Sequence, residues 1–269
     1  MIKCNLHTHS TFCDGNDKIE DTVLCAIEKG FDAIGFSGHS FTDFDLRYCM
    51  SDMETNIYIA NINMLKEKYK NKIEIYCGLE KDYLATDDRE YDYTIGSVHY
   101  FSKDGKLHDV DLSVEELKIA TDEFYGGDIY TTCEEYFKTV ADVKRKTGCD
   151  IIGHFDLIKK FNTNECLFNY SNPRYINASM DALNELLKQD VIFELNTSGT
   201  LPGRCGEMYP SDRILKEIQI KGGRVIITSD CHKKELLDYG FDVAIEKLKS
   251  IGFKSVCAIN KSNFIEQNL

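Results

Sequence analysis

Histidines and carboxylates recur along this sequence directly after short apolar runs. The stretch NLHTHSTFCDG (5–15) places His7 and His9 two residues apart, with Asp14 close behind. In an extended chain residues i and i+2 point to the same side, so both imidazoles can bind one ion. Taken alone, a histidine at a strand end is more often a partly buried hydrogen-bonding residue, and Asp14-Gly15 is most simply a turn. The stretch becomes a candidate metal site because other histidines and carboxylates occupy similar positions elsewhere in the chain.

Six of the seven histidines lie within a residue or two of the end of a predicted strand, and only His108 falls elsewhere, in a charged stretch. Three carboxylates share these strand ends, which makes nine candidate metal ligands: His7, His9, Asp14, His39, Glu80, His99, His154, Asp230 and His232. Without partners such a cluster would be costly to hold together, and divalent cations supply the missing charge. Nine nitrogen and oxygen ligands are too many for one ion, so roughly two to three ions are expected, and zinc, iron and manganese all suit the ligands.

The elements that must position these residues alternate regularly. Strands are predicted at 2–6, 33–37, 73–79, 93–98, 150–153, 191–196 and 224–229, with 255–259 as an eighth or outlying strand. Helices are predicted between them, at 17–29, 54–69, 113–124, 133–147, 174–189, 211–221 and 241–250. Alternation of this kind favours a parallel sheet with right-handed crossovers, and the number of units fits a closed α/β barrel better than an open sheet. Active sites of such barrels lie at the carboxyl ends of the strands, where the nine side chains would meet.

The composition of the chain limits its possible binding partners and its cellular compartment. A formal net charge of −13 argues against a nucleic-acid backbone or an anionic membrane as a partner. No apolar run approaches the roughly 18 residues of a membrane span, and the first residues lack the pattern of a secretory signal. The eleven cysteines form no C-x-x-C pair, so we expect reduced thiols in a cytoplasmic protein. The oligomeric state is left open.

The motifs together resemble those of the polymerase and histidinol phosphatase (PHP) family, and most closely its histidinol-phosphate phosphatase branch. They are HTHSTFCDG (7–15), GHS (38–40), GLE (78–80), GSVH (96–99), GHFD (153–156) and SDCH (229–232), in the family's order along the whole chain. The resemblance implies a distorted TIM-like (β/α)7 barrel that occupies 1–269 as a single domain. We expect a helical insertion at about 102–148, the one long excursion between strands, to cover the substrate.

The resemblance also implies how the ligands are shared. His7, His9, Glu80 and Asp230 would hold a first ion, and Glu80 would bridge to a second ion held by His99 and His154. Asp14, His39 and His232 would hold a third ion. Some family members have a histidine at the position of Asp14, and an oxygen ligand there can change the preferred metal.

A metal-dependent phosphomonoesterase follows from this set, with L-histidinol phosphate as the expected small-molecule substrate. A hydroxide that bridges two cations would attack phosphorus, Glu80 would hold the bridging ions, and Asp230 or a water would protonate the leaving group. Arg204 and Lys160 are the expected phosphate ligands, although solvated surface charges are an even alternative for the lysines of this loop, Lys159 and Lys160. Another small phosphate ester is the alternative substrate. An inactive PHP module that only binds is less favoured, because all nine ligand positions are filled.

Overall fold

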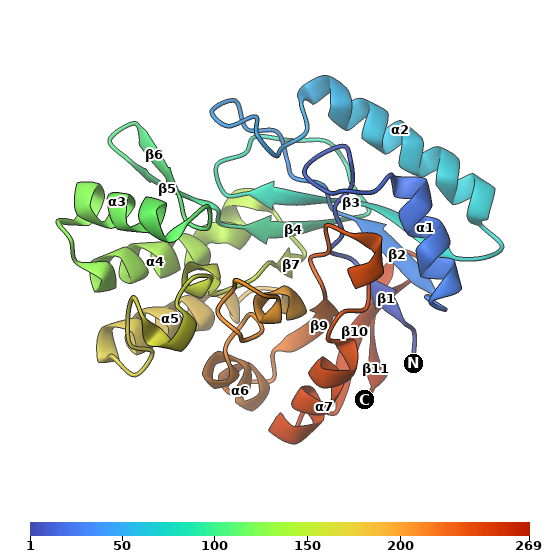
Figure 1. Cartoon of the computed structure of the whole chain (residues 1–269). Coiled ribbons are helices and arrows are strands. Elements are labelled where there is room, and N and C mark those ends of the chain that lie inside the picture. Colours follow the sequence, from blue (N-terminus) through green and yellow to red (C-terminus); the bar gives the residue numbers. More distant parts are fainter.

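Seven parallel strands curl into a barrel-like sheet in a computed structural model that describes all residues from 1 to 269 (Figure 1). Their order is β1 (Cys4–Asn5), β2 (Ala33–Phe36), β3 (Glu74–Asp82), β4 (Tyr93–Ser97), β7 (Ile151–Ile152), β8 (Ile192–Asn196) and β9 (Arg224–Thr228). Beyond them, β10 (Ser255–Asn260) pairs in parallel with β9, and β11 (Asn263–Asn268) pairs antiparallel with β10. The α/β fold and the distorted TIM-like barrel predicted from the sequence are confirmed.

Seven α-helices cover the outside of the sheet (Figure 1). They are α1 (Ile19–Glu28), α2 (Asp52–Tyr69), α3 (Val114–Tyr125), α4 (Ile129–Thr147), α5 (Pro173–Leu186), α6 (Asp212–Ile220) and α7 (Phe241–Ile251). Short 3₁₀ turns follow several strands: η1 (Leu157–Lys159), η2 (Thr163–Glu165), η3 (Thr197–Thr200) and η4 (Lys234–Leu236). All seven helices lie where the sequence predicts them, and none has both the length and the apolar character that a membrane span needs.

The side chains inside the barrel change from apolar to polar along the strands. Leu6, Ile95, Ile151, Ile192 and Ile226 belong to a separate apolar cluster of 12 buried residues. A strand alternates its side chains between two faces. Two residues further along the same strands, this alternation therefore places polar side chains above the apolar layer: Ser97, Glu194 and Thr228. The apolar layer thus lies directly below the layer of polar side chains inside the barrel.

The connection from β4 to β7 differs in part from the prediction. It begins with a hairpin of β5 (Tyr100–Lys103) and β6 (Lys106–Asp109), followed by α3 and α4. Figure 1 shows this hairpin beside α3, extending away from the barrel. Asp104 and Gly105 form its turn with positive φ angles of 52° and 78°, a conformation that Asp-Gly pairs adopt readily. His108, predicted to lie in a loop, is part of β6.

The first and last barrel strands meet only beyond their regular ends. An isolated bridge joins Thr8 to Cys231 in parallel register. The Cys231 amide donates to the carbonyl of His7 at 3.2 Å, and the His9 amide donates to the carbonyl of Cys231 at 3.0 Å. The barrel is therefore closed at its carboxyl rim by residues that neighbour predicted metal ligands.

Candidate metal centre

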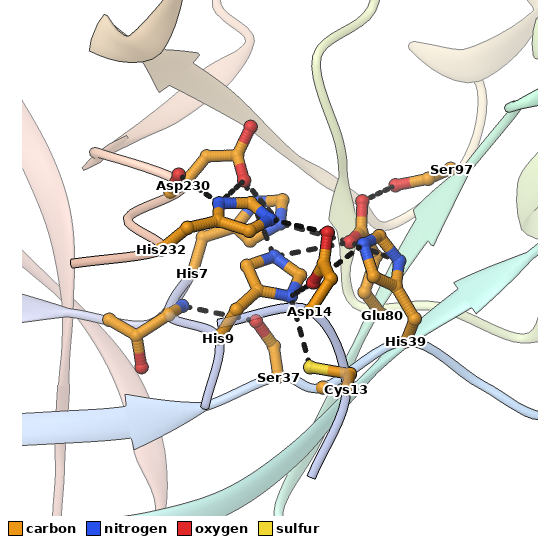
Figure 2. Close-up of polar contacts among 12 residues, drawn as sticks. His7, His9, Cys13, Asp14, Ser37, His39, Glu80, Ser97, Asp230 and His232 are labelled. Atoms are coloured by element: carbon orange, nitrogen blue, oxygen red, sulfur yellow. Dashed lines mark hydrogen bonds and ion pairs between the residues drawn. The ribbon is translucent and has the colours of Figure 1, made fainter. Parts of the chain in front are cut away.

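The nine predicted metal ligands come together at the carboxyl rim of the barrel. The structure brings to one place His7, His9 and Asp14 after β1, His39 after β2, Glu80 in β3, His99 after β4, His154 after β7, and Asp230 and His232 after β9. In Figure 2 the following labelled side chains point toward one another: His7, His9, Asp14, His39, Glu80, Asp230 and His232. Residues up to 225 positions apart in the sequence thus share one site, because parallel strands carry their carboxyl ends to one edge.

Glu80 lies at the centre of the cluster. Its Oε2 atom is 3.2 Å from His7 Nε2, 3.1 Å from His39 Nδ1 and 3.5 Å from His9 Nε2. Its Oε1 atom is 2.9 Å from His154 Nε2 and 3.4 Å from His99 Nε2, and it accepts a hydrogen bond from the Ser97 hydroxyl. The two carboxylate oxygens therefore face two different groups of imidazoles, as a bridging ligand would.

Three sets of ligand atoms are spaced for cation binding, with all atoms of a set within 4.8 Å of one another. The sets are His9, Asp14, His39 and His232; His7, His9 and Asp230; and His39, Glu80 and His99. They resemble the three sites implied from the sequence, but His9 is shared between two sets, and His39 joins Glu80. His154 belongs to none of the three sets and enters the cluster through its contacts with Glu80 and His99.

Orphaned polar atoms test whether metal ions fit here. His7 Nε2, His9 Nε2 and Glu80 Oε2 are buried without a hydrogen-bond partner. A buried polar atom left unpaired is costly, and these three belong to neighbouring side chains of the cluster. Imidazole nitrogens and carboxylate oxygens are also a donor set that zinc, iron and manganese accept. The residues present therefore fit divalent cations.

Hydrogen bonds behind the cluster orient two of its imidazoles. Glu194 Oε2 accepts a hydrogen bond of 2.7 Å from His7 Nδ1, which leaves His7 Nε2 to face Glu80. Asp82 Oδ2 lies 3.2 Å from His99 Nδ1 and accepts from the His99 amide at 3.0 Å. Carboxylates in this position fix the imidazole tautomer and ring orientation of metal ligands. Glu194 lies in the strand predicted at 191–196, and Asp82 lies two residues after Glu80 on the same strand, so both carry only the signal of a strand's carboxyl end.

Electrostatics keep the carboxylates of the cluster ionised. Burial raises the pKa of Glu80, but the surrounding histidines, His7 and His39 foremost, outweigh burial and hold it well below its usual range. Burial lowers the pKa of His39 to about 3, which leaves the imidazole neutral, as a metal ligand must be. For His7, burial acts to lower the pKa, and the carboxylates of Glu194 and Glu80 reverse this and raise it. A bound cation would replace this proton, since both compete for the same nitrogen.

A cavity of about 390 Å³ opens over the cluster. Its lining combines seven of the predicted ligands with residues from neighbouring loops, among them Arg47, Tyr48, Asp109, Asp111, Lys160 and Arg204. Arg204 Nη1 donates a 2.5 Å hydrogen bond to the Ser198 hydroxyl and lies 3.6 Å from Asp230 Oδ2. The two expected phosphate ligands, Arg204 and Lys160, therefore reach the same cavity as the metal ligands.

The other basic residues near the rim are engaged elsewhere. Lys159 is completely buried, 3.2 Å from Asp156 Oδ2, and donates to the carbonyl of Met208 at 2.9 Å. Arg47 lines the cavity, but its guanidinium is bound by the carboxylates of Asp45 and Asp109. Lys160 is also paired, with Asp111, but it lines the cavity whereas its neighbour Lys159 does not.

The fold and the cluster together define an α/β barrel protein with a candidate metal site of imidazoles and carboxylates at its carboxyl rim. Residues 5–198 match the model of the PHP domain, so the chain belongs to the PHP domain family. The chain is 27% identical over 274 residues to the histidinol-phosphatase of Bacillus subtilis, covering 92% of this chain and 100% of the relative. It is 26% identical over 284 residues to a probable histidinol-phosphatase of Schizosaccharomyces pombe, covering 95% and 89%.

Two solved structures share the fold along nearly their whole length. A putative histidinol phosphatase from Listeria monocytogenes superposes with a TM-score of 0.75 at 24% identity, covering 90% of this chain and 99% of that one. The histidinol phosphate phosphatase of Lactococcus lactis, solved with zinc, L-histidinol and phosphate, gives a TM-score of 0.71 at 20% identity and covers 98% and 99%. These likenesses establish the barrel as the shared fold.

Proposed function

We propose that this protein is a metal-dependent phosphatase that hydrolyses L-histidinol phosphate to L-histidinol and phosphate. The single observation that carries the proposal is the central place of Glu80, whose two oxygens face imidazoles on both sides at 2.9–3.5 Å. The family membership and the full-length relatives named histidinol-phosphatase support the same activity and the same small substrate. We further infer a single domain over 1–269, with the segment at about 102–148 as one wall of the site. A cytoplasmic location stays a prediction from composition.

The residues of this chain divide the work as follows. When bound, divalent cations supply Lewis acidity and lower the pKa of water so that it can act as a nucleophile. Glu80 lies between the two groups of imidazoles and contacts both, and Glu194 fixes the orientation of His7 through its hydrogen bond to Nδ1. Arg204 and Lys160 bind the phosphate oxygens and neutralise charge as it builds in the transition state. Asp230 also lines the cavity; burial raises its pKa, but His7 and His9 outweigh burial and hold the pKa well below the usual range, so the ionised carboxylate has no proton to give and a water is the candidate proton donor to the departing alkoxide.

The identity and number of the metals are part of the proposal. We infer two to three ions from zinc, iron and manganese, distributed over the three ligand sets described above. The set of His9, Asp14, His39 and His232 has one oxygen ligand, Asp14. The Asp14 carboxylate is 33% exposed and is the most accessible of the ligands. The ion held by this set should therefore be the first to exchange with metal ions in solution.

One comparison tests the proposal directly. Purified protein is assayed with L-histidinol phosphate and with a generic aryl phosphate, before and after chelation and again after addition of zinc, manganese or iron. A much larger kcat/KM for L-histidinol phosphate, lost on chelation and restored by metal, is the expected result. Equal turnover of both esters would assign the protein to another small phosphate ester, and full activity without metal would sink the mechanism.

A further inference from the structure

The end of β6 brings two aspartates to the wall of the cavity, and they differ in how they are paired. Both carboxylate oxygens of Asp109 lie 3.1 Å from Nη2 of Arg47. In Asp111, only Oδ2 is paired: it accepts a hydrogen bond of 2.8 Å from Lys160 Nζ, which also donates to the Asp111 carbonyl. The other oxygen of Asp111 forms no hydrogen bond within the protein, so one acceptor remains available at the cavity wall.

Asp111 has basic side chains and imidazoles around it at the cavity wall. Burial raises its pKa, but Lys160, His99 and His154 outweigh burial and hold the pKa at about 2, so the carboxylate is ionised at neutral pH. Arg204 also lies within electrostatic reach of Asp111. An ionised carboxylate beside phosphate ligands repels a phosphate, whereas its unpaired oxygen attracts a cation that the substrate carries.

The proposed substrate brings such a cation at a fixed place. In L-histidinol phosphate the primary ammonium is attached to the carbon next to the CH₂–O–P group, so a bound phosphate places the ammonium one carbon away. We propose that the free oxygen of Asp111 binds this ammonium, and that Asp111 thereby selects phosphate esters with a primary amine on the carbon next to the ester carbon. The inference rests on the proposed function, since it names a contact within the same site.

The other acidic stretch near the site is already engaged. In KDYLATDDREYDY (81–93), Asp82 binds His99, Asp87 binds Arg89, and Asp92 binds Lys66. None of these carboxylates lines the cavity. We therefore assign recognition of the ammonium to Asp111, which follows β6, rather than to this stretch.

The test compares two esters on three proteins. The esters are L-histidinol phosphate and the analogue that lacks only its amino group, imidazolylpropyl phosphate. The proteins are the wild type, Asp111→Asn and Glu123→Gln. An asparagine at 111 keeps the size of the side chain and an oxygen for Lys160. Glu123 pairs with Lys106 and His108 on the same hairpin without lining the cavity, so Glu123→Gln controls for loss of a nearby charge.

We expect Asp111→Asn to lower kcat/KM for L-histidinol phosphate by on the order of 10- to 100-fold, as for a lost hydrogen bond between charged groups, and to change the analogue by less than about 3-fold. Glu123→Gln should leave both values near wild type. Equal losses for both esters would mean that Asp111 only positions Lys160 and would overturn the inference. So would a wild type that hydrolyses both esters equally well, a comparison that needs no variant. Wild type inactive on L-histidinol phosphate would instead refute the proposed function.

Discussion

Glu194 lies directly behind His7, with its Oε2 atom 2.7 Å from His7 Nδ1. The same carboxylate accepts from the Thr228 hydroxyl, from the His154 amide and from the Asn196 side chain, so all its contacts are buried hydrogen bonds. One residue of β8 thereby fixes two histidines that come from β1 and β7. The orientation of the His7 imidazole is therefore set by a buried side chain that does not itself line the cavity.

The first prediction follows from this contact. Glu194→Gln should lower metal affinity by about 10- to 100-fold, because the neutral amide holds the His7 tautomer less firmly and makes the imidazole a weaker ligand. Metal titration followed by activity measures the effect. Glu185→Gln, on the exposed side of α5, is the matched control. An unchanged metal affinity would show that His7 needs no support from Glu194.

Glu80→Gln addresses the centre of the cluster. The amide cannot offer an anionic oxygen to both groups of imidazoles, so we expect turnover to fall by roughly two to four orders of magnitude, with reduced metal content. Far-UV circular dichroism should stay near wild type, because a glutamine of the same size fills the position. An active Glu80→Gln enzyme with full metal content would contradict the bridging role.

The phosphate ligands can be separated from the metal ligands by kinetics. Arg204→Met and Lys160→Met should each raise KM for the ester and the inhibition constant of inorganic phosphate by about 10-fold or more, because each removes a charged hydrogen-bond donor from the cavity. Metal content should remain at the wild-type level. Lys234→Met, at a surface ion pair with Asp17, is the control. Unaltered phosphate inhibition would remove the residue concerned from the site.

Lys159→Met probes the buried pair with Asp156. Removal of one member of a fully buried ion pair leaves the other charge uncompensated, so the free energy of unfolding should fall by about 3–5 kcal/mol. Burial already raises the pKa of Asp156, and loss of Lys159 would favour its protonated form further. Denaturant unfolding measures the change, and the double variant Lys159→Met with Asp156→Leu should recover part of it. A single variant as stable as wild type would show that the pair contributes little.

His108 gives a prediction about pH. Burial acts to lower its pKa, but Glu116 and Glu123, at 2.7 and 2.8 Å, outweigh burial and raise it above its ordinary value. A raised folded-state pKa stabilises the protein fully below the unfolded-state pKa, and this stability is lost as pH rises through the folded-state pKa. The difference in Tm between wild type and His108→Gln should therefore be larger near pH 6 than near pH 9. A difference that grows with pH would reverse this assignment.

Much of the fold was predictable because its strands and helices carry strong local patterns. The barrel strands are short apolar runs that end in a histidine or carboxylate, and the amphipathic helices between them have clear caps, such as Ser51 and Asp128. That the nine candidate ligands lie close together could be predicted for the same reason, since topology alone brings strand ends together. The hairpin of β5 and β6 was missed because each strand has only four residues, none of them β-branched, although Asp104-Gly105 was a usable turn signal.

The pairing of the basic residues was not predictable. Lys159 and Lys160 are adjacent in sequence, yet one is buried against Asp156 and the other reaches Asp111 at the cavity. Only the 3₁₀ turn η1 decides which side chain points inward, and nothing in local composition fixes that choice. Asp111 likewise carries no sequence signal, because its partner Lys160 lies 49 residues away.

The bridge between Thr8 and Cys231 has a mechanical consequence. The seam is crossed by one isolated bridge rather than by a ladder of paired residues, and His7 and His9 lie on one side of it while Asp230 and His232 lie on the other. Ions held by ligands from both sides would therefore link the two edges of the barrel. Loss of the ions would remove this link, so the amide protons of His9 and Cys231, whose hydrogen bonds cross the seam, should exchange with solvent faster in metal-free protein than in metal-loaded protein.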